Sequence, residues 1–290
     1  MKMLIRKGWT MTKTASKSGV TFKTIQYVYM LVCVIIALFP LVWVFLSSFK
    51  TNNEILSGGF TLPKSFSFDG YVRALELSPI LRFFLNSAII SVISALVNVL
   101  AGAMASYVFA RMRFRGRDHF FSFLMLSMVI PVSSLLQPVF QLFTKMGLYD
   151  TMTGLIIVYA ALNLPTTLLV LRSTFQTIPP NLEEAAYVDG AGFVRTFFQI
   201  MMPCAKGGIT SAAVLAFLNN WNEFTFALVL TKSERARTLS LALSYFSSQF
   251  SFNYTAMFAA ITIAVIPSIV VFTIFQEQVV TCLTAGAVKE

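Results

Sequence analysis

Five stretches of this chain contain no Asp, Glu, Lys or Arg over a length of about 20 residues or more, which is what a helix needs to cross a bilayer. They are residues 24–49, 83–110, 119–144, 151–171 and 238–276. A sixth hydrophobic stretch, residues 208–231, is interrupted only by Glu223. Since unpaired backbone groups are costly in lipid, these stretches must form helices. The sequence therefore predicts an all-α, polytopic membrane protein with six transmembrane helices.

The composition agrees with a membrane location and excludes a water-soluble enzyme. Hydrophobic residues make up 57% of the 290 residues and charged residues only 12%, about half the charged share of a soluble domain. The net charge of +10 is explained by basic cytoplasmic loops, so it predicts no binding of nucleic acid.

The basic residues predict the orientation. Six lie in residues 1–23, four in the short segment 111–117, three in and directly before the loop 173–207 (Arg172, Arg195 and Lys206) and one in the tail 277–290, which together make 14 of the 22 Lys and Arg. The positive-inside rule then places both termini in the cytoplasm and the segments 50–82 and 232–254 outside. The apolar run after residue 23 is too long for a signal peptide, so we expect an uncleaved first helix.

The predicted organisation is a cytoplasmic basic tail (1–23), one membrane domain (24–276) with a cytoplasmic loop (173–207), and a cytoplasmic C-terminal tail (277–290). We find no internal repeat of the kind that secondary transporters show. Pro131 and Pro138 predict a kink in the third stretch, which accounts for the polar residues between them without a role in transport.

Several kinds of chemistry lack the residues that they need. Cys33, Cys204 and Cys282 stand far apart and His119 is the single histidine, so we predict no metal, no cofactor and no catalytic residue. The phosphate-binding pattern G-x-x-x-x-G-K-[ST] is absent, so any ATP would be hydrolysed by another polypeptide. Glu223 is the one charge inside a predicted span, which disfavours the alternative of an ATP-independent channel or carrier.

The loop between the fourth and fifth stretches predicts a short surface helix. Pro179 and Pro180 fix its start, Glu183 and Glu184 suit the positive end of the helix dipole, and Gly190 with Gly192 can end it in a left-handed turn. Two alanines that follow the glutamates give a face with little side chain, to which another surface can come close.

This loop resembles the signature of the integral membrane permeases of binding-protein-dependent ABC importers: E-A-A, three residues, Gly, nine residues, then I-x-L-P. Glu184-Ala185-Ala186, Gly190, Ile200 and Pro203 keep that spacing, with Met202 in place of Leu. The resemblance implies a type I ABC importer permease fold in a bacterial or archaeal cytoplasmic (inner) membrane. It also implies that residues 181–192 form a coupling helix seated on the ATP-binding subunit, with the coupling residues Glu183, Glu184, Ala185, Ala186, Asp189, Gly190, Ile200 and Pro203.

Looser motifs resemble the carbohydrate branch of the family, in particular the second, six-helix permease of maltose-type importers. These motifs are Asn86-Ser87, the segment 221–224 and the closing segment 283–289. The implied partners are a second permease in a heterodimer, two ATP-binding cassette ATPase subunits, an extracytoplasmic solute-binding protein, a sugar or oligosaccharide and the lipid bilayer. A non-sugar solute such as a polyamine or phosphate is the alternative.

One dense polar cluster lies in a predicted span and is the candidate substrate path: Asn219, Asn220, Trp221, Asn222 and Glu223. Its amides and carboxylate can bond sugar hydroxyls, and the indole offers a face for a sugar ring. Two alternatives remain open at this stage. Trp221 can instead be an aromatic anchor at the membrane interface, and Glu223 can hold an outer gate by hydrogen bonding.

Overall fold

The computed structural model describes residues 17–58, 60–242, 246 and 253–287, and every regular element within these ranges is a helix. Residues 1–16 of the predicted basic tail and residues 288–290 of the predicted C-terminal tail lie outside the described ranges. The elements are α1 (Lys17–Ser47), α2 (Asn52–Leu56), α3 (Asp69–Leu77), α4 (Ile80–Arg111), α5 (Arg117–Leu126), η1 (Ser127–Val129), η2 (Val132–Leu135), α6 (Leu136–Lys145), α7 (Met152–Thr177), α8 (Asn181–Val188), α9 (Phe193–Thr196), the π-helix η3 (Phe197–Met201), α10 (Met202–Cys204), α11 (Lys206–Asn222), α12 (Thr225–Leu230), α13 (Leu239–Ala242) and α14 (Tyr254–Ala287).

Four of these helices, α1, α4, α7 and α14, are each long and apolar enough to cross a bilayer. Two bent helix pairs qualify as well, so the described residues hold four to six candidate spans, depending on whether each bent pair counts as one. Each predicted span has its counterpart in this set. The helix α14 is kinked at Phe275, which has a φ of −112° and a ψ of 17°, and most of the predicted C-terminal tail forms the helical part after this kink, up to Ala287.

The third predicted span is not a straight helix. The segments Arg117–Val129 and Val132–Lys145 meet at 95°, and the break falls at Ile130 and Pro131. Pro131 cannot donate a backbone hydrogen bond, and its carbonyl instead accepts bonds from the backbone and hydroxyl of Ser134, at 3.0 and 2.6 Å. The predicted kink is therefore confirmed at Pro131, whereas Pro138 lies within the first turn of α6, where proline is tolerated.

The prediction of one continuous helix over residues 208–231 is wrong. α11 ends at Asn222, Glu223 has an extended backbone with ψ of 126°, and α12 begins at Thr225. On its other side, α11 meets the segment Phe193–Cys204 at 79°. The chain can break at Glu223 because this side chain bonds amides of the following helix, as described below.

The centre of the fold is the packing of α4 against α7, which small and polar side chains allow to be close. A Cβ atom on Gly102 of α4 would lie 2.5 Å from Cγ2 of Thr167 of α7. Next to this contact, Nδ2 of Asn98 donates to the carbonyl of Ala160 at 2.7 Å, and the hydroxyl of Thr167 donates to Oδ1 of Asn98. Such close approach with interhelical hydrogen bonds is typical of helices packed in a membrane.

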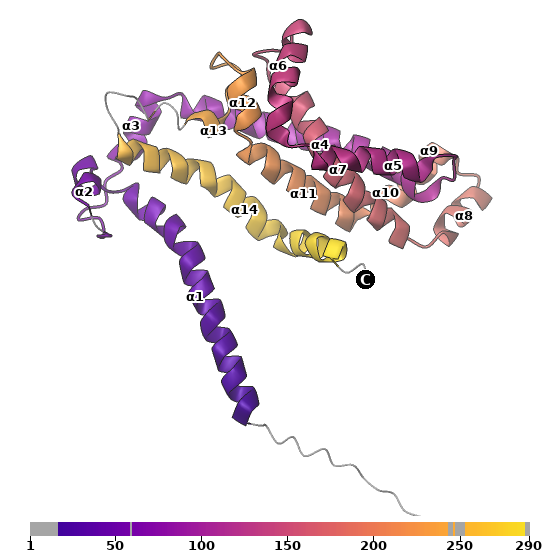
Figure 1. Cartoon of the computed structure of the whole chain (residues 1–290), viewed down its shortest axis with the longest axis horizontal. Coiled ribbons are helices and arrows are strands. Elements are labelled where there is room, and N and C mark those ends of the chain that lie inside the picture. The colour runs from indigo at the N-terminus through magenta and orange to yellow at the C-terminus, as the bar shows by residue number, and fades with distance from the viewer. Residues whose placement is uncertain (1–16, 59, 243–245, 247–252, 288–290) are drawn as a thin grey trace, which may run out of the picture.

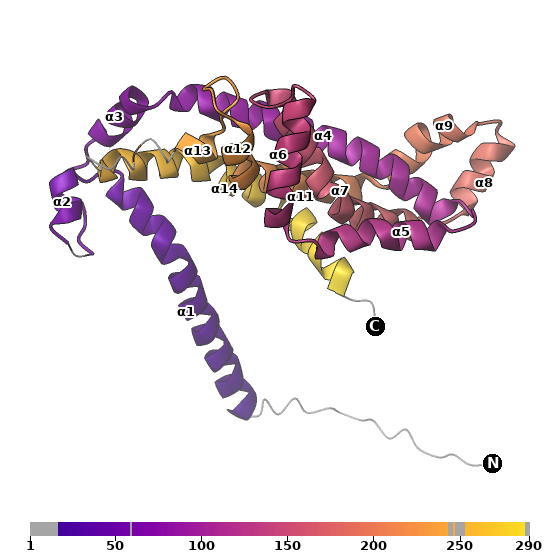
Figure 2. The same ribbon diagram turned by 45° about the horizontal axis from the view of Figure 1, so that its top comes forward.

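The two ends of the helix bundle carry different short elements, as Figures 1 and 2 show. The helices α2 and α3 lie at one end, α13 lies between α3 and α12, and α8 and α9 lie at the opposite end. The long helix α4 runs between the two ends. The helix α1 diverges from the bundle in both views, contacts α14, and leaves nearly all of its apolar residues exposed in the isolated chain.

Side chains fasten the connection between α12 and α13 at the α3 end. Asn86 near the start of α4 donates from Nδ2 to the carbonyls of Glu234, Arg235 and Arg237, and Oγ of Ser87 accepts from the amide of Leu239 at 2.7 Å. We call residues 232–239 the α12–α13 connection.

Asp150 in the turn before α7 fastens the start of the same connection. One of its carboxylate oxygens accepts from the amides of Lys232 and Ser233, both at 2.8 Å. Burial favours the neutral acid, but these amide bonds outweigh it and hold the pKa of Asp150 below its usual value. The carboxylate therefore stays ionised, and the contact intact, at neutral and mildly acidic pH.

The contact between Gly102 and Thr167 leads to a first prediction. Gly102→Val should lower the thermal stability of the purified protein in detergent, because the added side chain has no room against α7. Overpacking of this kind costs about 1–3 kcal/mol. Ala101→Val is the matched control, because Ala101 is exposed on the same turn of α4. Equal unfolding midpoints for the two variants would show that α4 and α7 are not in close contact there.

Candidate functional site

The loop between α7 and α11 begins with the short helix α8, as the sequence predicts. The amides of Glu183 and Glu184 bond the carbonyl of Pro180, so the two acidic residues occupy the first turn. At the other end, the amide of Gly190 bonds the carbonyl of Tyr187 at 3.0 Å. Gly190 has a φ of +78°, a left-handed conformation that glycine adopts at little cost. The predicted short helix and its glycine stop are both confirmed.

Two details of this loop differ from the prediction. Gly192 has a φ of −74° and an extended backbone, so it precedes α9 and does not contribute a left-handed turn. Ala185 and Ala186 do not share one open face, because Ala186 is 5% exposed and packs against the body while Ala185 is exposed. Only Ala185 offers another surface a close approach to the α8 backbone.

The outer side of α8 combines apolar and acidic side chains. Leu182, Tyr187 and Val188 are exposed, and Val188 is exposed to 87%. Glu184 on α8 and Asp189 directly after it are exposed as well. An apolar, partly acidic helix at the end of the bundle is a surface suited to a protein partner.

Glu183 differs from its neighbour Glu184 because it faces the body of the protein. Its Oε1 lies 2.8 Å from Nε of Arg111, the last residue of α4, and both side chains are about 15% exposed. In the sequence, Arg111 stands out only as one of the four basic residues of the segment 111–117. Nothing in the linear pattern brings residues 111 and 183 together.

The second half of the signature anchors the loop on the bundle. Ile200 lies in the π-helix η3 and is half-buried, while Pro203 is exposed in α10, just before the bend into α11. Proline cannot supply the backbone hydrogen bond of a regular helix, which suits the widened turn before it. The neighbouring Phe197 and Met201 are buried in the cluster that also contains Tyr107 and Phe175.

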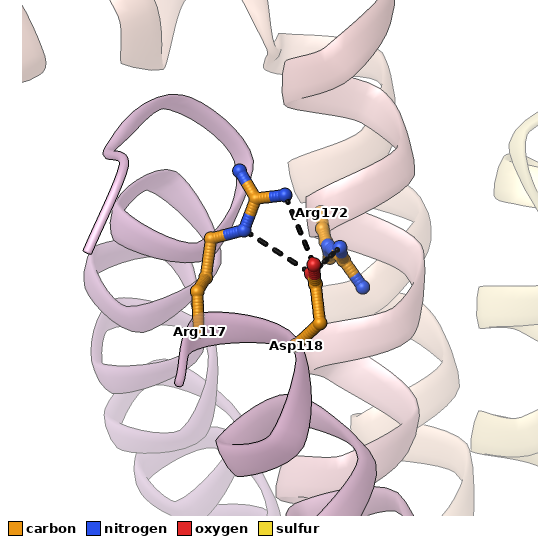
Figure 3. Close-up of polar contacts among 3 residues, drawn as sticks. All are labelled: Arg117, Asp118 and Arg172. Carbon is orange, nitrogen blue, oxygen red and sulfur yellow. Dashed lines mark hydrogen bonds and ion pairs between the residues drawn. The ribbon is translucent and has the colours of Figure 1, made fainter. Parts of the chain in front are cut away.

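A group of three charged residues fastens the start of α5 to α7 on the same end of the bundle (Figure 3). Asp118 lies 3.1 Å from Nε of Arg117 and 3.2 Å from Nη2 of Arg172. The guanidinium of Arg172 also stacks over the ring of Phe121, 3.9 Å from its centroid. None of these contacts involves α8.

The predicted substrate-path cluster is divided between buried and exposed positions. Asn219 and Asn222 are exposed, whereas Asn220 is buried between α4, α7 and α11. Nδ2 of Asn163 on α7 donates to Oδ1 of Asn220 at 2.8 Å, and Nδ2 of Asn219 donates to Oδ1 of Asn163 at 2.9 Å. The asparagines thus join α7 to α11, and Asn163 is a member of the cluster that the sequence did not single out.

The alternative of Trp221 as an interfacial anchor is wrong. The indole is 5% exposed and packs between Phe84 and Phe217, and its Nε1 donates to the carbonyl of Ala264 at 2.9 Å. Trp221 therefore fastens α11 to α14 inside the bundle. Its buried ring also offers no open face for a sugar in this conformation.

Glu223 holds the break between α11 and α12. Its carboxylate accepts from the amides of Phe226 and Ala227, at 2.8 and 3.1 Å, and from the hydroxyl of Tyr159 at 2.7 Å. Its own carbonyl accepts from the hydroxyl of Ser240 in α13 at 2.8 Å. The residue thus joins α7, α12 and α13, which agrees with hydrogen bonding as its structural role.

Within the described residues, no group of three or more His, Cys, Asp or Glu side chains could hold a metal ion.

Comparisons with known proteins identify the family. The model of the family described as "Binding-protein-dependent transport system inner membrane component" matches residues 98–281. A diacetylchitobiose uptake system permease protein of Streptomyces coelicolor is 35% identical over 281 residues, which cover 96% of this chain and 93% of that protein. A trehalose transport system permease protein of Mycobacterium tuberculosis is 35% identical over 255 residues, covering 87% and 93%.

A solved structure has the same fold. One chain of a bacterial ABC transporter involved in the import of alginate superposes with a TM-score of 0.79 at 24% identity, covering 90% of this chain and 98% of that one. Family membership excludes the alternative of an ATP-independent channel or carrier. The chain belongs to the inner membrane components of binding-protein-dependent transport systems and is the non-catalytic, multi-pass permease of an ABC importer.

Proposed function

We propose that this chain pairs with a second permease, two ATPase subunits and an extracytoplasmic binding protein to import an oligosaccharide. In this proposal α8 is the helix that the ATPase subunit moves. The observation that supports it is the exposed helix α8, with its left-handed stop at Gly190, at one end of the bundle. ATP-driven closure of the ATPases then shifts α8, and the bundle alternates between inward and outward access.

The substrate class is inferred from the relatives and from the polar groups of the bundle. The two relatives above are named for diacetylchitobiose and trehalose, both sugars. In this chain the exposed amides of Asn219 and Asn222 offer donors and acceptors that suit hydroxyl groups. A polyamine or phosphate would need charged partners, which these two uncharged amides do not supply.

A transport assay with purified complex tests the substrate class. Proteoliposomes that contain the complex and its binding protein should accumulate labelled disaccharide when ATP is supplied on the ATPase side. Labelled polyamine and phosphate should stay at the level without ATP. Accumulation of either of these solutes, with none of sugar, would contradict the proposed substrate.

Gly190 provides a test of coupling. Gly190→Val should abolish uptake and lower the stimulated ATPase rate with it, because a β-branched residue disfavours a φ of +78° and enlarges the docking surface. A loss of about 1.4 kcal/mol in the free energy of docking would already correspond to about tenfold weaker binding between α8 and the ATPase subunit. Gly192→Val is the control, because Gly192 has an ordinary φ and no neighbour near an added Cβ. Normal stimulated ATPase in Gly190→Val would contradict docking through α8.

The asparagines separate a path role from a structural role. Asn219→Ala and Asn222→Ala should both lower uptake, because both side chains are exposed. The unfolding midpoint should stay close to that of the wild type in Asn222→Ala, whose amide bonds only a carbonyl of its own helix, and should fall in Asn219→Ala, which loses the bond to Asn163. Asn220→Ala should lower the midpoint, because it removes the buried hydrogen bond between α7 and α11 and leaves Nδ2 of Asn163 only the carbonyl of Tyr159 as acceptor, at a cost of about 1–2 kcal/mol. Wild-type uptake in both exposed variants would place sugar contact on the other permease.

The orientation of the chain is part of the proposal and has its own test. Single cysteines at Arg115 and Asp69 are introduced into a chain whose three native cysteines are replaced. An impermeant thiol reagent added to intact cells should label position 69 and not position 115, because the basic segment 111–117 is expected to be cytoplasmic. Labelling at 115 alone would reverse the orientation.

A further inference from the structure

The helix α4 connects the two ends of the bundle without a break. It runs from Ile80 to Arg111 with no proline, and polar side chains fasten both of its ends. At one end Asn86 and Ser87 hold the α12–α13 connection through four hydrogen bonds to its backbone. At the other end Arg111 reaches α8. A continuous helix held in this way moves as a unit when either end is displaced.

Arg111 contacts α8 at two points. Its Nε pairs with the carboxylate of Glu183 in the first turn of α8, at 2.8 Å. Its Nη2 donates to the carbonyl of Ile178, the residue before the two prolines that start the helix. One planar guanidinium therefore holds both the entry and the first turn of α8, a geometry that the single ammonium group of lysine reproduces only in part.

Solvent screens this ion pair less than the other ion pairs at the same end of the bundle. The side chains of Arg111 and Glu183 are 14% and 15% exposed, whereas Asp118, which pairs with Arg117 and Arg172, is 67% exposed. Solvent screens an exposed pair far more than a partly buried one. The pair that reaches α8 is thus the one suited to transmit a displacement.

We infer that Arg111 is a positioning residue for energy coupling: it fixes α8 to the end of α4, so that a shift of α8 moves α4 and, through Asn86 and Ser87, the α12–α13 connection. This inference rests on the proposed function, in which the ATPase subunit moves α8. Arg111 is then the residue through which a movement of α8 reaches the helix bundle.

The test measures sugar transported per ATP hydrolysed by the full complex in proteoliposomes. Arg111→Gln and Glu183→Gln should each lower this ratio by about fivefold or more, the usual lower range of a coupling effect. The double variant should lose no more than Arg111→Gln alone, because both changes remove one interaction. Arg111→Lys should keep more of the ratio than Arg111→Gln, since it retains the charge.

Asp118→Asn is the matched control, because it removes the exposed pairs with Arg117 and Arg172 and leaves α8 untouched (Figure 3). The amount of sugar that this variant transports per ATP hydrolysed should stay close to that of the wild type. A wild-type ratio in Arg111→Gln, or losses that add in the double variant, would overturn the inference. So would an equal loss in Asp118→Asn.

A cross-link separates this inference from the proposed function. A cysteine at Ala185, which is exposed on α8, should form a cross-link with an ATPase subunit in the assembled complex, both with and without Arg111→Gln. If the cross-link forms and Arg111→Gln couples normally, only the role of Arg111 fails. If no cross-link forms in the otherwise wild-type chain, the docking of α8 itself fails.

Discussion

The fold depends on side chains that complete the hydrogen bonding of the backbone where helices break. In lipid, an amide or carbonyl without a partner costs several kcal/mol, so a break is stable only where side chains replace the lost bonds. The carboxylate of Glu223 accepts hydrogen bonds from amides in the first turn of α12. The amide of Asn86 donates hydrogen bonds to three carbonyls of the α12–α13 connection. The bundle can therefore contain bent and interrupted helices at defined positions.

Close packing of α4, α7 and α11 makes these polar contacts possible. Gly102 lets α4 approach α7 so closely that Asn98 and Thr167 bond across the interface, and Asn163 bonds two asparagines of α11. The three helices then form a body that carries α8 at one end and the α12–α13 connection at the other. The separation of α1 from this body in Figures 1 and 2 leaves a long apolar surface for lipid or another membrane subunit.

The polar cluster in the fifth span illustrates how one sequence motif can combine several roles. The five consecutive residues 219–223 are divided between exposed and buried positions because of the helical turn and the break that follows it. Asn220, Trp221 and Glu223 hold helices together, while Asn219 and Asn222 stay exposed. Their polar character predicted that all five line the substrate path. The sequence does not show which side of a helix faces its neighbours, so it could not separate the exposed residues from the buried ones.

The sequence by itself determined the class of fold and the place of the short helix α8. Long uncharged stretches must be helical in lipid, and the prolines, acidic residues and Gly190 act on the local backbone, so both predictions follow from local physics. Only the tertiary structure decided that the fifth span breaks at Glu223, that Trp221 is buried, and that Arg111 meets Glu183. Those outcomes depend on contacts between residues far apart in the chain, whose free energies come from packing and burial that no local pattern encodes.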